Sequence, residues 1–210
     1  MPAAEDCRAS WVNTTHDWAA TVDVEHLASI RDRPTVMAPG GALHLVLEVL
    51  AYAADEAEVR GGGTSHVTLG ADGSISVADD GRGTDTRLDE DGRPVRKPIM
   101  ATKDLRFFDA PDAQLLPDGH PRRGMSAVAA LSDRLVHHNR RHDGAWSQEY
   151  RDGLSVTDLV PVEADTTTGT TVTFWPTSSV EPSISTLEVT PQALGVWPCL
   201  TVTLIDHRTN

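Results

Sequence analysis

The residues with the clearest chemical potential are an aspartate and the glycines around it. Asp79 begins an Asp-Asp-Gly-Arg-Gly run that covers residues 79–83 and follows a short apolar stretch. A carboxylate at the end of a strand accepts hydrogen bonds from the amino group of a purine, and Gly81 and Gly83 allow the backbone to approach a flat ring. Thr170 is able to bond the same carboxylate or a bridging water. Together these residues predict a site for a flat, nitrogen-containing ring.

Apolar residues that would enclose such a ring come from three other parts of the chain. Val49 and Ala53 lie one turn apart in a segment of helical periodicity, whereas Met125 and Val172 belong to a later helix and a later strand. Small-molecule sites are lined mostly by apolar side chains with a few polar groups. We therefore expect these side chains to form the walls of the site.

Hydrophobic periodicity and turn signals predict an α+β fold, a two-layer α/β sandwich with a mixed, mostly antiparallel sheet. Apolar residues recur at three- and four-residue intervals over 43–58, which is typical of a buried helix, and a glycine triplet at 61–63 ends it. The expected helices cover residues 23–32, 43–58, 98–108, 124–132 and 190–196. The expected strands cover residues 66–70, 74–78, 133–141, 145–151, 170–175 and 200–205, and residues 34–41 are expected to form a loop.

The composition favours one folded domain and excludes several classes of protein. Of the 210 residues, 39 % are hydrophobic and 23 % are charged, which is typical of a globular chain. The formal net charge is −13, and this acidic excess argues against direct nucleic-acid binding, because phosphate contacts need clustered lysine and arginine. The 2 cysteines are too few for a disulfide scaffold.

The chain shows no signal for a membrane or for secretion. No run approaches the ~18 apolar residues of a membrane span, and the first residues lack the basic and apolar regions of a secretory signal. We therefore expect a cytoplasmic protein without membrane contact. Residues 1–22 show no clean period and are expected to form an N-terminal arm, whereas residues 23–210 form one domain. The histidines do not combine with a third ligand at metal-binding spacing, so no metal site is predicted.

A helix that carries Glu48, followed by a strand ending in Asp-Asp-Gly-Arg-Gly, resembles the Bergerat-type ATP-binding fold. This ATPase fold is shared by gyrase B subunits, MutL, histidine kinases and certain heat-shock chaperones. The resemblance is most specific to the N-terminal ATPase domain of gyrase B, and it extends over about residues 25–206. Several blocks in the order and spacing of that family make it stronger than the Asp79 run alone. The further blocks are IRDRPTVM at 30–37, Ile99-Met100, GMSAVAALS at 124–132 and GTTVTFWP at 169–176.

The resemblance implies that the ligand is ATP or another adenine-type molecule. In the family, a glutamate at the position of Glu48 is the general base that activates water. Glu56 and Arg82 fall where the family pairs a helix residue with the loop, and Arg141 falls where gyrase B has an arginine used by natural-product inhibitors. The ligand-binding residues that follow from the pattern and the resemblance are Val49, Ala53, Glu56, Asp79, Gly81, Arg82, Gly83, Met125, Arg141, Thr170 and Val172.

On the phosphate side the chain departs from the family. Tyr52 stands where the family has an asparagine whose oxygen binds Mg²⁺, and a neutral phenol is a poor ligand for that ion. The family's glycine-rich lid presents backbone N–H groups to the phosphates, and here it reads Asp-Gly-His-Pro-Arg-Arg-Gly at 118–124. Arg122 and Arg123, directly before Gly124, are expected to compensate in part as charged phosphate ligands. Mg²⁺ binding and ATP hydrolysis are therefore expected to be impaired.

Three functions remain open at this stage. The favoured one is a gyrase-B-like domain that binds an adenine-type or inhibitor-type small molecule, extended to a sequestering or self-resistance role toward natural products directed at gyrase. The alternatives are a functional ATPase domain that uses Glu48, with Arg122 and Arg123 replacing the lid, and a scaffold that pairs with a protein partner. Because the sequence stops at Asn210 without the family's transducer domain, it is not expected to act as a topoisomerase alone.

Overall fold

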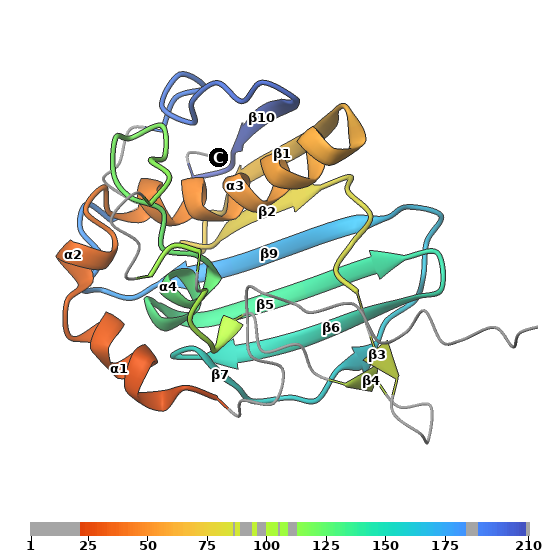
Figure 1. Ribbon diagram of the computed structural model, residues 1–210, viewed down its shortest axis with the longest axis horizontal. Helices are drawn as coiled ribbons and strands as arrows, with labels where there is room; N and C mark the ends of the chain where they lie inside the picture. Colours follow the sequence, from red (N-terminus) through yellow and green to blue (C-terminus); the bar gives the residue numbers. More distant parts are fainter. Residues whose placement is uncertain are drawn as a thin grey trace, which may run out of the picture.

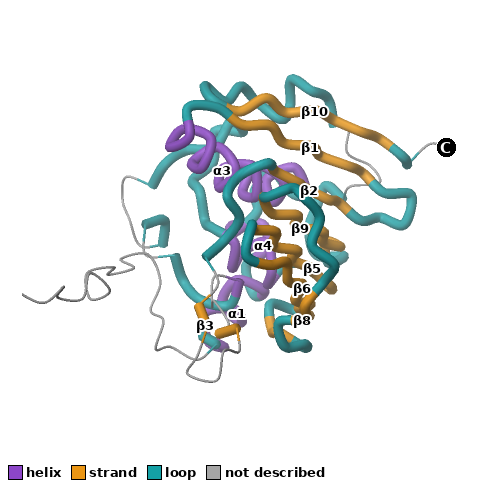
Figure 2. The backbone as a smooth tube through the Cα atoms, turned by 90° about the vertical axis from the view of Figure 1, so that its right-hand side faces the viewer, coloured by secondary structure: helices purple, strands orange, loops and turns teal. Residues whose placement is uncertain are grey.

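A layer of helices covers one face of a large sheet (Figure 1). Figure 2, turned by 90°, shows the helices on one side of the strands. This computed structural model describes residues 22–85, 87–88, 94–95, 100–104, 106–108, 113–183 and 189–208. Within these ranges the arrangement confirms the predicted two-layer α/β sandwich. The expected N-terminal arm lies outside the described residues, apart from Val22.

The helical layer is organised around one long helix. The described helices are α1 (Val24–Arg31), α2 (Pro34–Met37), α3 (Ala42–Arg60) and α4 (Met125–Ala130). On α3, apolar side chains such as Leu45 and Leu50 are fully buried, which explains the apolar periodicity of that segment. Asp23 caps α1, since its carboxylate accepts the backbone N–H of His26 at 2.9 Å. Three of the predicted helices are thereby confirmed, with ends that differ by one or two residues.

The sheet is mixed and mostly antiparallel, as predicted. Its strand order is β10-β1-β2-β9-β5-β6-β7, with β8 paired to β6, and only β10 and β1 run parallel among the described strands. The strands are β1 (Gly63–Leu69), β2 (Ile75–Asp79), β5 (Ser132–Arg141), β6 (Gly144–Arg151), β7 (Leu154–Ser155), β8 (Val160–Pro161), β9 (Gly169–Pro176) and β10 (Leu200–Asp206). A separate ladder joins β3 (Arg87–Leu88) and β4 (Pro94–Val95).

The register of the central strands places residues from distant parts of the chain in rows beneath α3. Val172 on β9 pairs with His137 on β5, which pairs with Gln148 on β6. In a sheet, directly paired residues point to the same face, and alternate residues along a strand share it. Because Val172 is buried beneath the helices, the other members of its row face the helical layer as well. The sheet therefore carries the site on its helix-covered face.

Two expected helices and one expected loop differ from the structure. At 190–196 the chain makes a single turn, in which the Thr190 carbonyl accepts the N–H groups of Ala193 and Leu194. Gly195 then adopts a φ of +80°, a left-handed conformation that ends the turn. Conversely, 34–41 contains the short helix α2, which begins at Pro34, a residue suited to the first helical position.

The helix predicted over 98–108 lies partly outside the described residues. In the described part, the Asp104 carbonyl accepts the N–H groups of Phe107 and Phe108, both at 3.1 Å, and the segment forms turns. The carboxylate of Asp104 also bonds the N–H of Arg106 at 3.1 Å. This local hydrogen bonding by an aspartate competes with helix formation.

Candidate functional site

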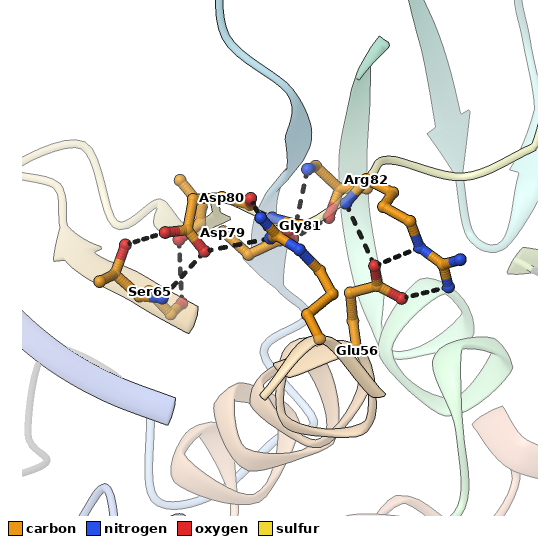
Figure 3. Close-up of polar contacts among 10 residues, drawn as sticks. Glu56, Ser65, Asp79, Asp80, Gly81 and Arg82 are labelled. Atoms are coloured by element: carbon orange, nitrogen blue, oxygen red, sulfur yellow. Dashed lines mark hydrogen bonds and ion pairs between the residues drawn. The ribbon is translucent and has the colours of Figure 1, made fainter. Parts of the chain in front are cut away.

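Asp79 lies at the end of β2, where its carboxylate is held by two neighbouring segments (Figure 3). Its Oδ1 accepts the backbone N–H of Gly81 at 2.8 Å. Its Oδ2 accepts the backbone N–H of Thr170 at 3.2 Å and also the Thr170 hydroxyl. The structure therefore brings together the aspartate and the threonine that the sequence analysis paired, although they are 91 residues apart.

A cavity of about 280 Å³ opens beside this carboxylate. It lies between α3 and the helix-facing side of β2, β9, β5 and β6. The predicted site residues that line it are Val49, Tyr52, Ala53, Glu56, Asp79, Gly83, Met125, Thr170 and Val172. The predicted residues that do not line it are Glu48, Gly81, Arg82, Arg122, Arg123, Gly124 and Arg141. The ring side of the prediction thus converges on one cavity, whereas most residues of the phosphate side lie outside it.

Glu56 and Arg82 join α3 to the loop after β2 (Figure 3). The Arg82 guanidinium donates from Nε to Oε1 at 2.6 Å and from Nη2 to Oε2 at 2.9 Å. The hydrogen bond from Arg82 lowers the pKa of Glu56 below its ordinary value. Because the Arg82 side chain is 65 % exposed, the pair forms at the rim of the cavity and positions the loop. This is the pairing that the sequence analysis expected.

Two glycines make close approaches that a side chain would block. A Cβ on Gly81 would lie 2.7 Å from Asp79 Oδ1 and 2.9 Å from Glu56 Cγ. Gly83 has a φ of +75°, and a Cβ there would lie 2.4 Å from the Arg140 carbonyl oxygen. The loop therefore packs directly against both α3 and β5, which is why this run needs its glycines.

Glu48 is fully buried and faces the beginning of α4. Its carboxylate accepts the backbone N–H of Gly124 at 2.8 Å and the backbone N–H of Arg123. The Nε2 atom of His44, one turn earlier on α3, lies 3.4 Å from Oε1. All three neighbours are positively polarised, so they stabilise a carboxylate that sits in the protein interior.

His44 extends this contact toward the segment before α4. Its Nδ1 lies 2.7 Å from Asp118 Oδ2, so the imidazole bridges Asp118 and Glu48. Burial alone would lower the pKa of His44, but the hydrogen bonds and charges of Asp118 and Glu48 outweigh it and raise the pKa to about 9. His44 is therefore an imidazolium at neutral pH, and it lies between the carboxylates of Asp118 and Glu48.

Tyr52 ends in a second polar cluster. Its hydroxyl donates to Asp104 Oδ2 at 2.8 Å, and burial raises the pKa of the phenol above its ordinary value. Arg106 binds the same carboxylate, from Nη2 to Oδ2 at 2.7 Å and from Nε to Oδ1 at 3.0 Å. Tyr52 is thus a neutral phenol whose hydroxyl is already committed to the protein.

Arg122 is turned away from the cavity and is only 1 % exposed. Its guanidinium forms two parallel hydrogen bonds to Asp55, at 3.1 and 2.9 Å, and another to Gln114 at 3.1 Å. The guanidinium carbon lies 4.5 Å from the centre of the Tyr52 ring and 4.3 Å from that of Phe107. In this structure Nη1 and Nη2 of Arg122, which was expected to face phosphate, donate to Asp55 and Gln114, whereas its buried Nε has no hydrogen-bond partner among the described residues.

The other two predicted arginines also lie outside the cavity lining. Arg141 Nη1 lies 2.8 Å from Asp85 Oδ1 and donates to the carbonyl of Gly83 at 3.3 Å. Arg123 contributes its backbone N–H to Glu48. Arg141 therefore braces the loop after β2 from the outside.

Several residues of the site were missed from the sequence. His44, Asp118 and Asp104 lie beside predicted residues, but their partners are distant along the chain. His137, Asn139, Trp146, Gln148 and Tyr150 line the cavity from β5 and β6. A usable signal was present in the alternation of these two strands, which gives them one common face. Which face lies beneath α3 could not be read from alternation alone.

The predicted site has two halves that differ in what their side chains contact. The ring half, beside Asp79, offers a carboxylate acceptor, an apolar slot and close backbone approach. In the phosphate half, the Tyr52 hydroxyl donates to Asp104, and the Arg122 guanidinium donates to Asp55 and Gln114. In the described ranges, no group of three or more His, Cys, Asp or Glu side chains is placed to hold a metal ion.

No described helix is long and apolar enough to cross a membrane.

The similar proteins are B subunits of DNA gyrase and of DNA topoisomerase 4. The chain is similar to the B subunit of DNA gyrase from Micrococcus luteus, with 33 % identity over 201 residues that cover 90 % of this chain and 28 % of that protein. It is similar to the novobiocin-resistant gyrase B protein of Streptomyces niveus, with 30 % identity over 206 residues that cover 93 % of this chain and 30 % of that protein.

A third relative is the B subunit of DNA topoisomerase 4 from Staphylococcus epidermidis, with 32 % identity over 198 residues that cover 89 % of this chain and 30 % of that protein. No protein-family model matches the chain. The chain spans less than a third of the length of these curated relatives. Each alignment is long enough to include both Glu48 and Asp79.

Proposed function

This chain is a gyrase-B-like domain, and from that premise we propose that it binds an adenine-type ring in the cavity beside Asp79 and hydrolyses Mg²⁺-ATP poorly or not at all. The observation that carries the proposal is the contrast within the site. The cavity keeps an acceptor for a ring, whereas the groups where phosphates and Mg²⁺ would be bound are joined to one another.

Ring binding is supported by the remaining acceptor capacity of Asp79. A carboxylate has about four lone-pair positions on its two oxygens. The two hydrogen bonds from Thr170 use those of Oδ2, and the bond from Gly81 uses one of Oδ1. One position on Oδ1 remains for a donor such as the amino group of adenine. Val49, Ala53 and Val172 supply the apolar contacts to the ring.

Impaired hydrolysis is supported by the contacts of Glu48. A general base must lie within hydrogen-bond reach of the water that it activates. Here the carboxylate accepts two backbone N–H groups and lies beside the His44 imidazolium, away from the cavity lining. These contacts favour a structural role, in which Glu48 holds the beginning of α4 against α3.

A domain that binds a ring and does not turn over ATP is suited to sequestration. The resemblance places Arg141 where gyrase B has an arginine used by natural-product inhibitors, and a gyrase-B-like domain offers a related cavity. We therefore extend the proposal to the binding of such compounds, with aminocoumarins as the first test class. In this role the protein would lower the free concentration of the compound.

Isothermal titration calorimetry tests the proposal with four probes: adenosine, a non-hydrolysable ATP analogue with Mg²⁺, the same analogue without Mg²⁺, and an aminocoumarin. We expect adenosine or the aminocoumarin to bind, and Mg²⁺ to add nothing to the affinity of the ATP analogue. The Glu48→Ala variant should bind the ring probes as the parent chain does.

The alternative function, an ATPase domain related to type II topoisomerases, gives the opposite pattern. It requires Mg²⁺-dependent binding of the ATP analogue and phosphate release that Glu48→Ala abolishes while binding persists. That combination would overturn the proposal. If none of the four probes binds, the proposal is also overturned, and a scaffold that pairs with another protein is favoured.

A further inference from the structure

The cavity extends well beyond the position of a single ring. Two rows of paired residues lead away from Asp79 across three strands. One row runs from Thr170 on β9 through Asn139 on β5 to Trp146 on β6. The second runs from Val172 through His137 to Gln148, and all six side chains line the same cavity.

The length of these rows leaves room for a second ring. Neighbouring strands are about 4.8 Å apart, so β9 and β6 are separated by roughly 10 Å. A purine that bonds Asp79 and lies between Val49 and Val172 occupies the part of the cavity over β2 and β9. The part over β5 and β6 then remains for another portion of the ligand, and Leu159 lines its far end.

The polar groups in this second part already bond to the protein. Gln148 donates from Nε2 to the Thr157 carbonyl at 3.2 Å and accepts the Tyr150 hydroxyl at 2.7 Å. Asn139 accepts the backbone N–H of Thr84 at 2.7 Å and donates to the Thr84 carbonyl at 2.8 Å. A ligand portion here therefore meets mainly the ring surfaces of Trp146 and Tyr150, which favour contact with another aromatic ring.

The charges around the cavity disfavour an anionic ligand portion. Within the described part of the chain, three carboxylates line it, from Glu56, Asp79 and Asp85. Among the described lysine and arginine side chains, Arg106 alone lines it, and that guanidinium is paired with Asp104 at 2.7 Å. A triphosphate would meet more negative than positive charge in this region.

We propose that the ligand of this site is a purine-type ring that carries an uncharged aromatic extension, and that this extension lies over β5 and β6 against Trp146. The inference rests on the proposed function, because it takes the Asp79 ring site as the other half of the ligand. It assigns the β5–β6 part of the cavity as the region that selects among ring ligands, with Trp146 as its main contact.

Calorimetric titration of the full chain with three adenine derivatives tests this assignment. Methyladenine and benzyladenine carry a methyl and a benzyl group on the same imidazole nitrogen, and ATP carries its ribose triphosphate there. In the proposed orientation, the amino group on the other ring bonds Asp79 and that nitrogen faces the part of the cavity over β5 and β6. We expect benzyladenine to bind about tenfold more tightly than methyladenine, since the benzyl group buries apolar surface against an aromatic ring. ATP should bind no more tightly than methyladenine.

Two tryptophan variants locate the effect. Trp146→Ala should bring the affinity of benzyladenine close to that of methyladenine, and a circular-dichroism spectrum that matches the parent's shows that the variant is folded. Trp175→Ala is the matched control. Trp175 belongs to β9 but points to the other face of the sheet, where it stacks with Arg134 at 4.8 Å. This control should keep the tenfold preference.

The possible failures are distinguishable. Equal affinities for methyladenine and benzyladenine would overturn the aromatic extension and leave the ring site in place. A benzyl preference that survives in Trp146→Ala would overturn the assignment to β6. No binding of any adenine derivative would overturn the proposed function together with this inference.

Discussion

The two halves of the site are built on the same helix and behave differently. Residues 49, 53 and 56 of α3 form one stripe at helical spacing, and residues 48, 52 and 55 form a stripe shifted by one position. The first stripe faces the open cavity beside Asp79. In the second stripe, each side chain is bonded to the segment between 104 and 124. A rotation of one residue around the helix thus separates a stripe that faces the cavity from a stripe whose polar groups are paired, and Tyr52 of the second stripe also lines the cavity.

This difference follows from the side chains of the two stripes. Small and apolar groups in the first stripe, Val49 and Ala53, leave space for a ring. Glu48, Tyr52 and Asp55 carry groups that bond strongly, and the chain supplies them with His44, Asp104 and Arg122. Hydrogen bonds to these partners offset the free energy that is needed to bury the polar groups. Leaving any of the groups buried without a partner would destabilise the folded protein.

Arg122→Ala should have the largest effect and would break the packed half. It removes a guanidinium that is 1 % exposed, together with its hydrogen bonds to Asp55 and Gln114. We expect a loss of about 3 kcal/mol in the free energy of unfolding. This value is at the low end of the range for breaking a buried ion pair, because Asp55 is 40 % exposed. Urea denaturation measures it, with Arg134→Ala, whose side chain is 40 % exposed and whose partner Glu149 is 23 % exposed, as the milder control. Equal losses in both variants would contradict the difference in burial.

The pH dependence of stability tests the charge on His44. Because its pKa is raised to about 9 in the folded protein, its stabilising contribution is complete below the ordinary value of 6.5 and is lost as the pH rises through 9. The loss should reach about 3 kcal/mol. Urea denaturation between pH 6 and 10 should show this decline in the parent chain and a flatter profile in His44→Gln. Parallel profiles would show that His44 is not charged in the folded state.

Asp79→Asn addresses the open half. The amide replaces one acceptor oxygen with a donor, so it cannot reproduce the bonds to Gly81, Thr170 and a ring amino group together. We expect ring binding to weaken by about tenfold to a hundredfold, the range for a hydrogen bond to a charged group. Asp80→Asn is the control, because Asp80 bonds Thr64 and does not line the cavity. Calorimetry with adenosine that finds equal losses for both variants would place the ring elsewhere.

Tyr52→Asn should have the smallest effect and sharpens the comparison. It introduces a ligand type suited to Mg²⁺, but Arg122 and Glu48 keep their present partners. The gain in affinity for a Mg²⁺-bound ATP analogue should stay below about fivefold, or roughly 1 kcal/mol. A much larger gain would mean that this one side chain closes the phosphate half.

The ring half could be predicted because its signals are local or strongly patterned. Asp79, Gly81 and Gly83 lie within one short run, and Val49 and Ala53 follow from helical spacing alone. The pairing of Glu56 with Arg82 was expected from the resemblance, and the structure has it. The contacts in the phosphate half were harder to predict. An arginine before α4 has the same sequence signal whether its side chain faces a ligand or an aspartate. Arg122 faces Asp55.

By itself, the sequence determined the layers, the central helix and the strand that ends in Asp79, since these depend on residue type and short-range periodicity. The tertiary structure decided which polar groups remain available. It directs Arg122 to Asp55, places His44 between Asp118 and Glu48, and sets Trp146 in one row with Thr170. The physical reason is that hydrogen-bond partners and strand register join residues distant along the chain, and only the folded arrangement selects among the competing partners.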